Sequence, residues 1–288
     1  MFTVAHDNLW LTQPFAPVSL GALESKAGML ERIDNKYVVD EHVLRQAIPD
    51  LSEHFDMLDI EGCRAFTYDT CYFDDADCRN YFDHHQSRKK RIKVRMRKYL
   101  EAGLCFVEVK LKDRRGATVK KRLRTEVDRY GMLDASAEQF VRKVYFDLYH
   151  RPFECDIFRN LDMRYKRITL VAKDGGERMT LDNGLQFFMD GQDRAIDESL
   201  FVIEAKSAKG NGIADRILRR LHQHPTKHVS KYCTGLASLR DGTKQNNFRR
   251  AMRKLGLLEG QTQAAALARL AALIAALSDW SMIGLELV

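Results

Sequence analysis

The sequence predicts an α+β protein in which helices pack on an antiparallel β-sheet. Short segments alternate between charged and apolar residues, glycine-containing turns separate several of them, and no regular strand–helix–strand alternation appears. The 288 residues contain no repeat, low-complexity block or linker. One large domain with a substantial core is therefore the expectation.

The strands and helices are expected in the following order. Strands are predicted at residues 32–39, 90–97, 106–112, 118–125, 165–172, 178–181 and 200–206, with hairpin turns at Gly116 and at residues 174–176. Helices are predicted at 41–48, capped by Asp40 and stopped by Pro49, from Ser136 to about 148, at 213–221 and at 243–258. The apolar run 264–277 contains Arg269 and is shorter than the roughly 20 residues that span a bilayer. We expect it to form a helix that packs on the body of the protein or on a partner.

Composition narrows the functional classes. Lys and Arg number 47 against 40 Asp and Glu, a net charge of +7 that favours polyanionic partners. The six cysteines form no CxxC pair and no signal peptide is visible, so a reducing cytoplasm is expected rather than structural zinc or disulfides. The P-loop, GxGxxG and HExxH motifs are absent.

The strongest pattern lies in the strands themselves. Successive side chains point to opposite faces of a strand, and most of these strands have one apolar and one mainly basic face. The basic faces read Arg32, Asp34, Lys36; Lys93, Arg95, Arg97; Glu108, Lys110, Lys112; Lys120, Arg122, Arg124; Arg178, Thr180, Asp182; and Glu204, Lys206. These faces lie either in solvent or inside a barrel that encloses a bound polyanion, with its apolar face under the helices.

An enclosed basic surface suits a triphosphate. Arg and Lys match its charge, and phosphoryl transfer needs mainly positioning and charge neutralisation from the protein. A divalent ion would need oxygen ligands, for which Glu204, Glu108, Asp34 and Asp182 are the candidates on the basic faces. The alternative for each of them is an ion pair with a neighbouring cation.

Several of these strings resemble one known family. They are Glu31-Arg-Ile-Asp-Asn-Lys36, Lys93-Val-Arg95-Met-Arg97-Lys-Tyr99, Phe106-Val-Glu108-Val-Lys110, Val119-Lys120-Lys-Arg122, Tyr165-Lys-Arg167, Arg178-Met-Thr-Leu-Asp182, Phe201-Val-Ile-Glu204-Ala-Lys206 and Ser230-Lys231-Tyr232. In this order they are similar to the VTC domain, the polyphosphate polymerase domain of the CYTH/triphosphate tunnel metalloenzyme superfamily. The resemblance implies a closed antiparallel eight-stranded β-barrel over residues 28–240, between an N-terminal segment, 1–27, and a C-terminal helical extension, 241–288.

The resemblance also implies roles for individual residues. Transfer of the ATP γ-phosphate to a growing polyphosphate chain would be carried by Lys36, Arg95, Arg97, Arg167, Arg178 and Lys206. Phosphates would also contact Lys110, Lys120, Arg122, Tyr165, Lys231 and Arg32. Glu204 would bind Mn²⁺ or Mg²⁺, with Glu108 and Asp34 as further candidates.

One departure separates the possible reactions. Hydrolases and cyclases of the superfamily open with ExExK, whereas this first strand reads Arg32-x-Asp34-x-Lys36. Arg32 replaces the first glutamate of that motif with a cation, which favours the polymerase. Asp34 still provides a carboxylate, so a metal-dependent triphosphatase is the alternative. A non-catalytic polyphosphate-binding module is the third interpretation. Nucleic acid is not expected as a partner because the cations lack interleaved stacking aromatics. A membrane-protein partner would fit the basic helix and the apolar run near the C-terminus.

Overall fold

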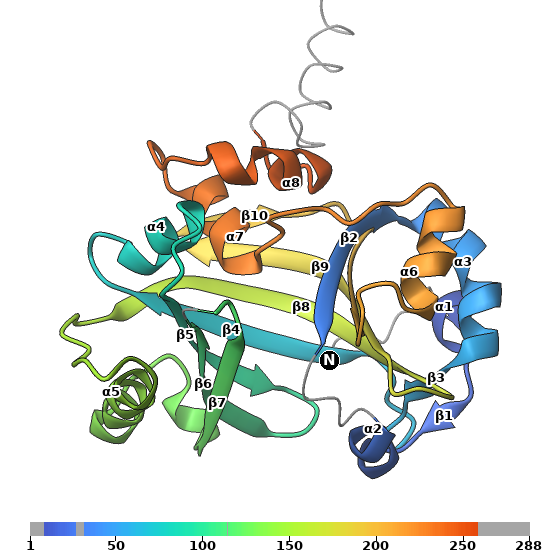
Figure 1. The fold of residues 1–288 in the computed structure, drawn as a ribbon, viewed down its shortest axis with the longest axis horizontal. Helices are drawn as coiled ribbons and strands as arrows, with labels where there is room; N and C mark the ends of the chain where they lie inside the picture. Colours follow the sequence, from blue (N-terminus) through green and yellow to red (C-terminus); the bar gives the residue numbers. More distant parts are fainter. Residues whose placement is uncertain (1–8, 27–31, 114, 259–288) are drawn as a thin grey trace, which may run out of the picture.

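The computed structural model describes residues 9–26, 32–113 and 115–258 (Figure 1). Eight strands are hydrogen-bonded in the order β2-β11-β9-β8-β4-β5-β6-β7, and all neighbours on this path are antiparallel. The strands are β1 (Pro17–Val18), β2 (Ile33–Asp40), β3 (Phe55–Leu58), β4 (Phe66–Asp74), β5 (Arg91–Tyr99), β6 (Leu104–Lys112), β7 (Thr118–Thr125), β8 (Phe158–Ala172), β9 (Arg178–Met189), β10 (Gln192–Ala195) and β11 (Leu200–Ser207). Off the main path, β3 joins β8, β10 joins β9, and β1 pairs in parallel with β3.

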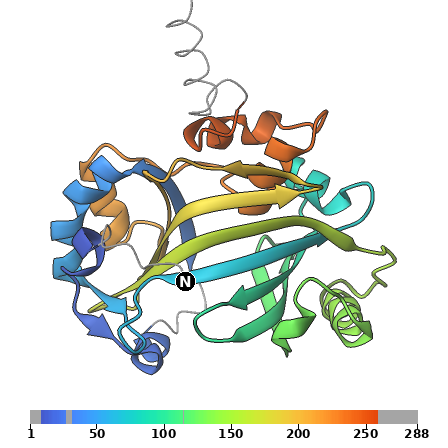
Figure 2. The same ribbon diagram turned by 180° about the vertical axis from the view of Figure 1, so that it is seen from behind.

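The predicted strands all form, and β7 has the predicted bounds. The longest strands, β8 and β9, extend further than predicted and cross the middle of the molecule in both views (Figure 1, Figure 2). The sequence analysis missed β4, which lies between β8 and β5. Both faces of β4 are largely buried, with Tyr72 packed on one side and Cys71 on the other, so it lacks the alternation that marks the others.

The helices are α1 (Leu9–Thr12), α2 (Leu20–Lys26), α3 (Glu41–His54), α4 (Arg79–His85), α5 (Ala135–Tyr149), α6 (Ile213–Arg220), α7 (Lys231–Leu239) and α8 (Arg249–Lys254). Among the described residues, two single 3₁₀ turns accompany them, η2 (Val127–Arg129) and η3 (Asn246–Phe248). None of the helices in the described part of the chain is long and apolar enough to cross a membrane.

Several predicted helix ends are wrong. Asp40 caps α3 as predicted, but the helix continues through Pro49, because burial of Leu44, Ala47, Ile48 and Leu51 on its inner side outweighs one lost backbone hydrogen bond. The cap of α5 is Asp134, which accepts a hydrogen bond from Ala137 N, rather than Ser136. The helix predicted at 243–258 is reduced to η3 and α8. The run 264–277 lies outside the described residues.

The apolar faces of the strands are covered by helices, as the alternation predicts. On β2, β9 and β11 this face, for example Tyr37, Leu181 and Ile203, packs with residues of α1, α3 and α6. On β5 and β6 the apolar face packs with α5. The opposite face of the sheet is therefore the concave, charged one. At one end it is filled by an apolar cluster to which α4, α7 and the segment around α8 contribute.

The prediction of a closed barrel is wrong in its hydrogen bonding. In the described residues β2 and β7 are the two ends of the path and do not pair. The free edge of β2 is instead occupied by the segment 225–230, because Thr226 N donates to Lys36 O at 2.6 Å and Lys36 Nζ donates to Val229 O at 3.1 Å. On the other side Lys93 Nζ of β5 donates to Ser230 Oγ at 2.9 Å. This segment, rather than β7, links the β2 end of the sheet to β5.

Candidate active site

The charged side chains of neighbouring strands lie in register on the concave face. Lys36 of β2 is opposite Glu204 of β11, which is opposite Thr180 of β9. One step along, Asp34, Lys206 and Arg178 form a second row. These rows place the residues of strands far apart in sequence beside one another, which a single strand could not do.

The two ends of the sheet also face each other. Burial and the charge of Lys36 on β2 together lower the pKa of Lys110 on β6 to about 8, against the opposing charge of Glu204. Such coupling requires proximity, so β6 faces β2 and β11 across the concave side. Lys120 on β7 is 46% exposed, yet burial also lowers its pKa to about 8. We call the space enclosed by the basic faces of β2, β5, β6, β7, β9 and β11 the tunnel.

Glu108 is committed to ion pairs. Its carboxylate is 1% exposed and lies 2.6 Å from Arg95 and 2.5 Å from Lys120. Burial alone would raise its pKa, but these cations and Arg97 hold the pKa well below the usual range. Glu108 therefore orders the cations of β5 and β7. The ion pairs expected as the alternative do form, and a metal ligand at Glu108 stays a prediction.

Asp182 of β9 likewise forms ion pairs with cations of neighbouring elements, Arg167 of β8 and Lys231 of α7. It is fully buried, and Arg167 donates to its two oxygens at 2.5 and 2.7 Å. Lys231, the first residue of α7, donates to it at 2.5 Å. Burial raises the pKa of Asp182, but the two cations outweigh this effect and lower it to about 2. The pair fixes α7 to the sheet and holds Arg167 in the tunnel.

Glu204 and Asp34 are less engaged in ion pairs than Glu108 and Asp182. The Glu204 side chain is 16% exposed, and its nearest cation is Lys206 at 3.5 Å. Burial opposes its ionisation, but Lys36 and Lys206 hold its pKa well below the usual range, so it is a carboxylate at neutral pH. Asp34 is 32% exposed and pairs loosely with Arg32 at 3.6 Å.

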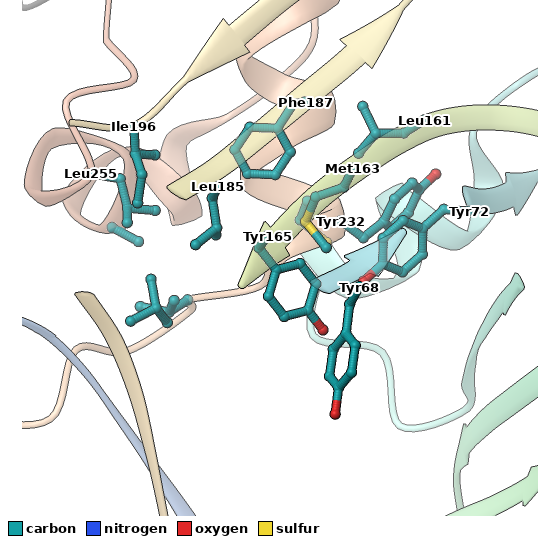
Figure 3. Packing of buried hydrophobic residues seen from close by; sticks show 14 of the residues in the cluster. Tyr68, Tyr72, Leu161, Met163, Tyr165, Leu185, Phe187, Ile196, Tyr232 and Leu255 are labelled. Atoms are coloured by element: carbon teal, nitrogen blue, oxygen red, sulfur yellow. The ribbon is translucent and has the colours of Figure 1, made fainter. Parts of the chain in front are cut away.

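Two arginines are held by aromatic rings. The guanidinium of Arg97 lies 5.2 Å from the Tyr68 ring centroid and 5.8 Å from that of Tyr165, and the guanidinium of Arg167 lies 5.3 Å from both. The rings meet edge to face at 5.3 Å. In Figure 3 their hydroxyl groups point away from the apolar packing around Leu185. These contacts hold the guanidinium planes without using their hydrogen-bond donors.

Three buried groups that can donate hydrogen bonds have no partner in the described structure of this region. They are the Tyr165 hydroxyl, Arg178 Nε and the Thr180 hydroxyl. Burial, together with the charge of Arg167, lowers the pKa of Arg178, so its positive charge is poorly compensated. Native proteins rarely leave such donors unpaired, and an anion with several acceptor oxygens would satisfy all of them.

The structure thus brings together most of the residues predicted as a site. Arg32 and Arg122 are at the margin: Arg32 is 41% exposed, and Arg122 is exposed and stacks on Phe106 at 5.0 Å. Sequence reasoning did not select Lys93, Tyr68 or Thr180 as site residues. The alternation that placed Lys93 and Thr180 on the basic faces could have found those two, whereas Tyr68 lies on the missed strand β4.

Four tunnel lysines give the site a distinctive pH dependence. Burial lowers the pKa of Lys93, Lys110, Lys120 and Lys206 to about 8 each. A bound polyanion stabilises the protonated forms, so binding takes up protons and weakens as pH rises through 8. We expect tripolyphosphate affinity to fall about tenfold or more between pH 7.5 and 9.5, because the loss of lysine charge outweighs the last ionisation of the ligand, which adds one negative charge over the same range.

Isothermal titration calorimetry in buffers of different ionisation heat measures both the affinity and the proton uptake. Lys206→Arg, which keeps its charge throughout, should flatten the pH dependence. A constant affinity with no proton uptake would contradict the assignment of these lysines to the binding surface.

No group of three or more His, Cys, Asp or Glu residues in the described ranges could hold a metal ion by itself. The donors present nevertheless fit a divalent cation that shares its ligands with phosphate. Mg²⁺ in particular is commonly bound by one or two carboxylates together with substrate phosphates and water. Glu204, with its lightly engaged oxygens, and Asp34 are the carboxylates that could take this part.

Three of the solved structures that are similar to this chain illustrate the level of similarity. Among solved structures, a candidate adenylate cyclase of Bacillus halodurans is similar at 14% identity with a TM-score of 0.45, covering 69% of this chain and 95% of that one. The PH1819 protein of Pyrococcus horikoshii has 15% identity and a TM-score of 0.39, with coverage of 69% and 91%. HpAC1 of Hippeastrum, described as having a dominant triphosphatase activity, has 14% identity and a TM-score of 0.39, with coverage of 72% and 95%.

No curated protein matches the sequence. The family model of the VTC domain matches residues 31–240, well over half of the chain and the whole set of strands that line the tunnel. The chain belongs to the VTC domain family.

Proposed function

We propose that this protein is a polyphosphate polymerase that transfers the γ-phosphate of ATP to the end of an inorganic polyphosphate chain in the tunnel. The main support is the excess of positive over negative side chains in the tunnel lining. Its cations outnumber its carboxylates, and two of the carboxylates, Glu108 and Asp182, are already engaged in ion pairs. The cations are Lys36, Lys93, Arg95, Arg97, Lys110, Lys120, Arg167, Arg178, Lys206 and Lys231, and the carboxylates are Asp34, Glu108, Asp182 and Glu204. A lining of this kind binds two polyanions end to end, because it offsets the repulsion between them.

The reaction needs little covalent help from the protein. A terminal oxygen of the acceptor chain attacks the γ-phosphorus, the bond from that phosphorus to the β,γ-bridging oxygen breaks, and ADP leaves with the electron pair. The attacking oxygen is already anionic, so no general base is required. Arg97, Arg167 and Arg178 hold the transferred group through charge-assisted hydrogen bonds. Glu204 would hold Mn²⁺ or Mg²⁺ together with phosphate oxygens, and such an ion supplies further charge neutralisation.

Hydrolysis makes a different demand on the site. A water nucleophile must lose a proton, and a base is usually a carboxylate or a histidine within hydrogen-bond reach. Asp34 is paired with Arg32 at the margin of the tunnel, which leaves Glu204 as the carboxylate best placed inside. A triphosphatase is the second candidate, since the Asp34 pair is loose and the carboxylate is partly exposed.

Incubation with ATP and Mn²⁺ tests the proposal. We expect equal amounts of ADP and of phosphate incorporated into a ladder of polyphosphate on a gel. Release of orthophosphate from ATP or tripolyphosphate without any polymer would establish the triphosphatase instead. Tight polyphosphate binding with no turnover of either substrate would leave only a binding module.

A further inference from the structure

A cavity of about 350 Å³ opens beside the tunnel, and its walls differ from the tunnel lining. It lies between β2, the end of α4 and the segment 225–230, and it shares Lys36 with the tunnel. Lys36 faces Glu204 across the β2–β11 pair, so a ligand in the cavity that also contacts Lys36 would extend directly toward the candidate metal ligand. The cavity is therefore a side chamber of the tunnel.

Part of the chamber wall is apolar. Pro225, Val229, Cys233 and Phe248 line it, and the last three are buried. An inorganic phosphate chain gains nothing from such a wall. Pockets with apolar walls and a few polar groups are typical of sites for organic ligands. The size also lies within the roughly 300–1,000 Å³ of small-molecule pockets.

The polar groups of the chamber include acceptors as well as cations. His84 Nδ1 lies 2.8 Å from the carbonyl oxygen of Asn80, which can only accept, so Nδ1 carries the proton and Nε2 is an acceptor. Burial lowers the pKa of His84 to about 2, which keeps the ring neutral. Asp34 adds a carboxylate. Phosphate oxygens are themselves acceptors and cannot pair with these groups, whereas hydroxyl and amino groups can.

Thr226 supplies an unpartnered polar group to the same chamber. Its side chain is 4% exposed and its hydroxyl has no hydrogen-bond partner in the described structure. Its backbone is fixed, because Thr226 N donates to Lys36 O at 2.6 Å. A buried hydroxyl held in this way is satisfied when a ligand offers it a partner.

We propose that this chamber binds the nucleoside of the phosphate donor, with the base against the apolar wall, the sugar hydroxyls and amino group near the acceptors, and the phosphates passing Lys36 into the tunnel. The proposal rests on ATP being a substrate of the proposed function. It adds a place for the part of the donor that inorganic polyphosphate lacks, and it makes the chamber the element that distinguishes donor from acceptor.

The experiment compares ATP with tripolyphosphate, both measured by calorimetry without divalent ions so that no turnover occurs. Thr226→Val removes the hydroxyl at nearly constant volume and should weaken ATP binding about threefold to tenfold, the usual effect of one neutral hydrogen bond. Thr226→Phe fills the chamber and should weaken ATP binding more than about tenfold. Both variants keep the backbone N–H, and tripolyphosphate affinity should stay within about twofold, which also shows that they fold.

Equal losses for ATP and tripolyphosphate, or no loss for ATP in the filled variant, would refute the nucleoside chamber. Weaker binding of long-chain polyphosphate with unchanged ATP binding would also refute it, and would assign the chamber to the chain. These outcomes are independent of polymer formation by the wild-type protein, so failure of the polymerase assay is recognised separately.

Discussion

Glu204→Gln is expected to lower metal-dependent turnover at least about a hundredfold. Even groups that only orient a metal ligand contribute roughly 10- to 100-fold, and the nearest cation lies 3.5 Å from the Glu204 carboxylate, which leaves its oxygens lightly engaged. Phosphate binding should persist, because glutamine removes a negative charge from a basic surface and leaves every cation in place. Initial rates of ADP formation over a Mn²⁺ titration, together with tripolyphosphate binding, measure the two effects.

Asp162→Asn is the matched control, since this strand carboxylate pairs with Arg159 outside the tunnel at 2.9 Å. It should leave the rates unchanged. Wild-type rates in Glu204→Gln, with an unaltered Mn²⁺ dependence, would remove Glu204 as the metal ligand.

The largest effect on stability is expected for Asp182→Asn. This change leaves Arg167 and Lys231 buried without their counter-charge, and removal of one partner of a buried pair typically costs about 3 kcal/mol or more of unfolding free energy. Chemical denaturation measures the loss. Tripolyphosphate should raise the melting temperature of this variant more than that of the wild type, since the anion replaces the missing charge.

The outer pair of Arg164 with Asp69 has the same two-bond geometry, at 2.6 and 2.8 Å, but its arginine is 51% exposed. Asp69→Asn should therefore cost less than about 1 kcal/mol. A similar cost for both variants would mean that the Asp182 cluster is not an ion pair that matters to the fold.

The low pKa of Asp182 also fixes the sign of its pH dependence. Because the folded value, about 2, lies below the roughly 3.9 of an unfolded aspartate, its contribution is complete above pH 4 and is lost as the pH falls toward 2. The difference in stability between wild type and Asp182→Asn should narrow over that interval.

Alternation along single strands was enough to separate the two faces of the sheet. It placed Glu204, Lys206 and Arg178 on the side that proved concave, because burying Ile203 and Met179 under helices leaves only one orientation. The resemblance to the VTC family then joined strands that alternation treats independently. Alternation describes one strand at a time, and the resemblance describes the order of motifs along the chain. Neither describes contacts between the side chains of different strands.

Contacts between neighbouring strands, and with the segment 225–230, decided what the sequence left open. In the sequence, Glu108 and Glu204 are both single glutamates on basic strand faces. In the structure, Glu108 forms short ion pairs with Arg95 and Lys120, whereas the nearest cation to Glu204 lies 3.5 Å away. Similarly, the edge of β2 could have paired with β7 until the segment around Thr226 is seen to occupy it. Tyr68 was not predicted as a site residue because β4 is buried on both faces. An apolar run without alternation fits a helix as well as a strand.

Within the part of the chain that the structure describes, β2 and β7 are the ends of the sheet, and such ends bear on aggregation. A free strand edge can template pairing with another copy of the chain, which leads to aggregation. The segment 225–230 covers the edge of β2. On β7 the edge carries Lys120, Lys121, Arg122 and Arg124 within eight residues, and like charges on two approaching copies repel each other. The positive charge at this edge thus also keeps separate molecules from joining their sheets.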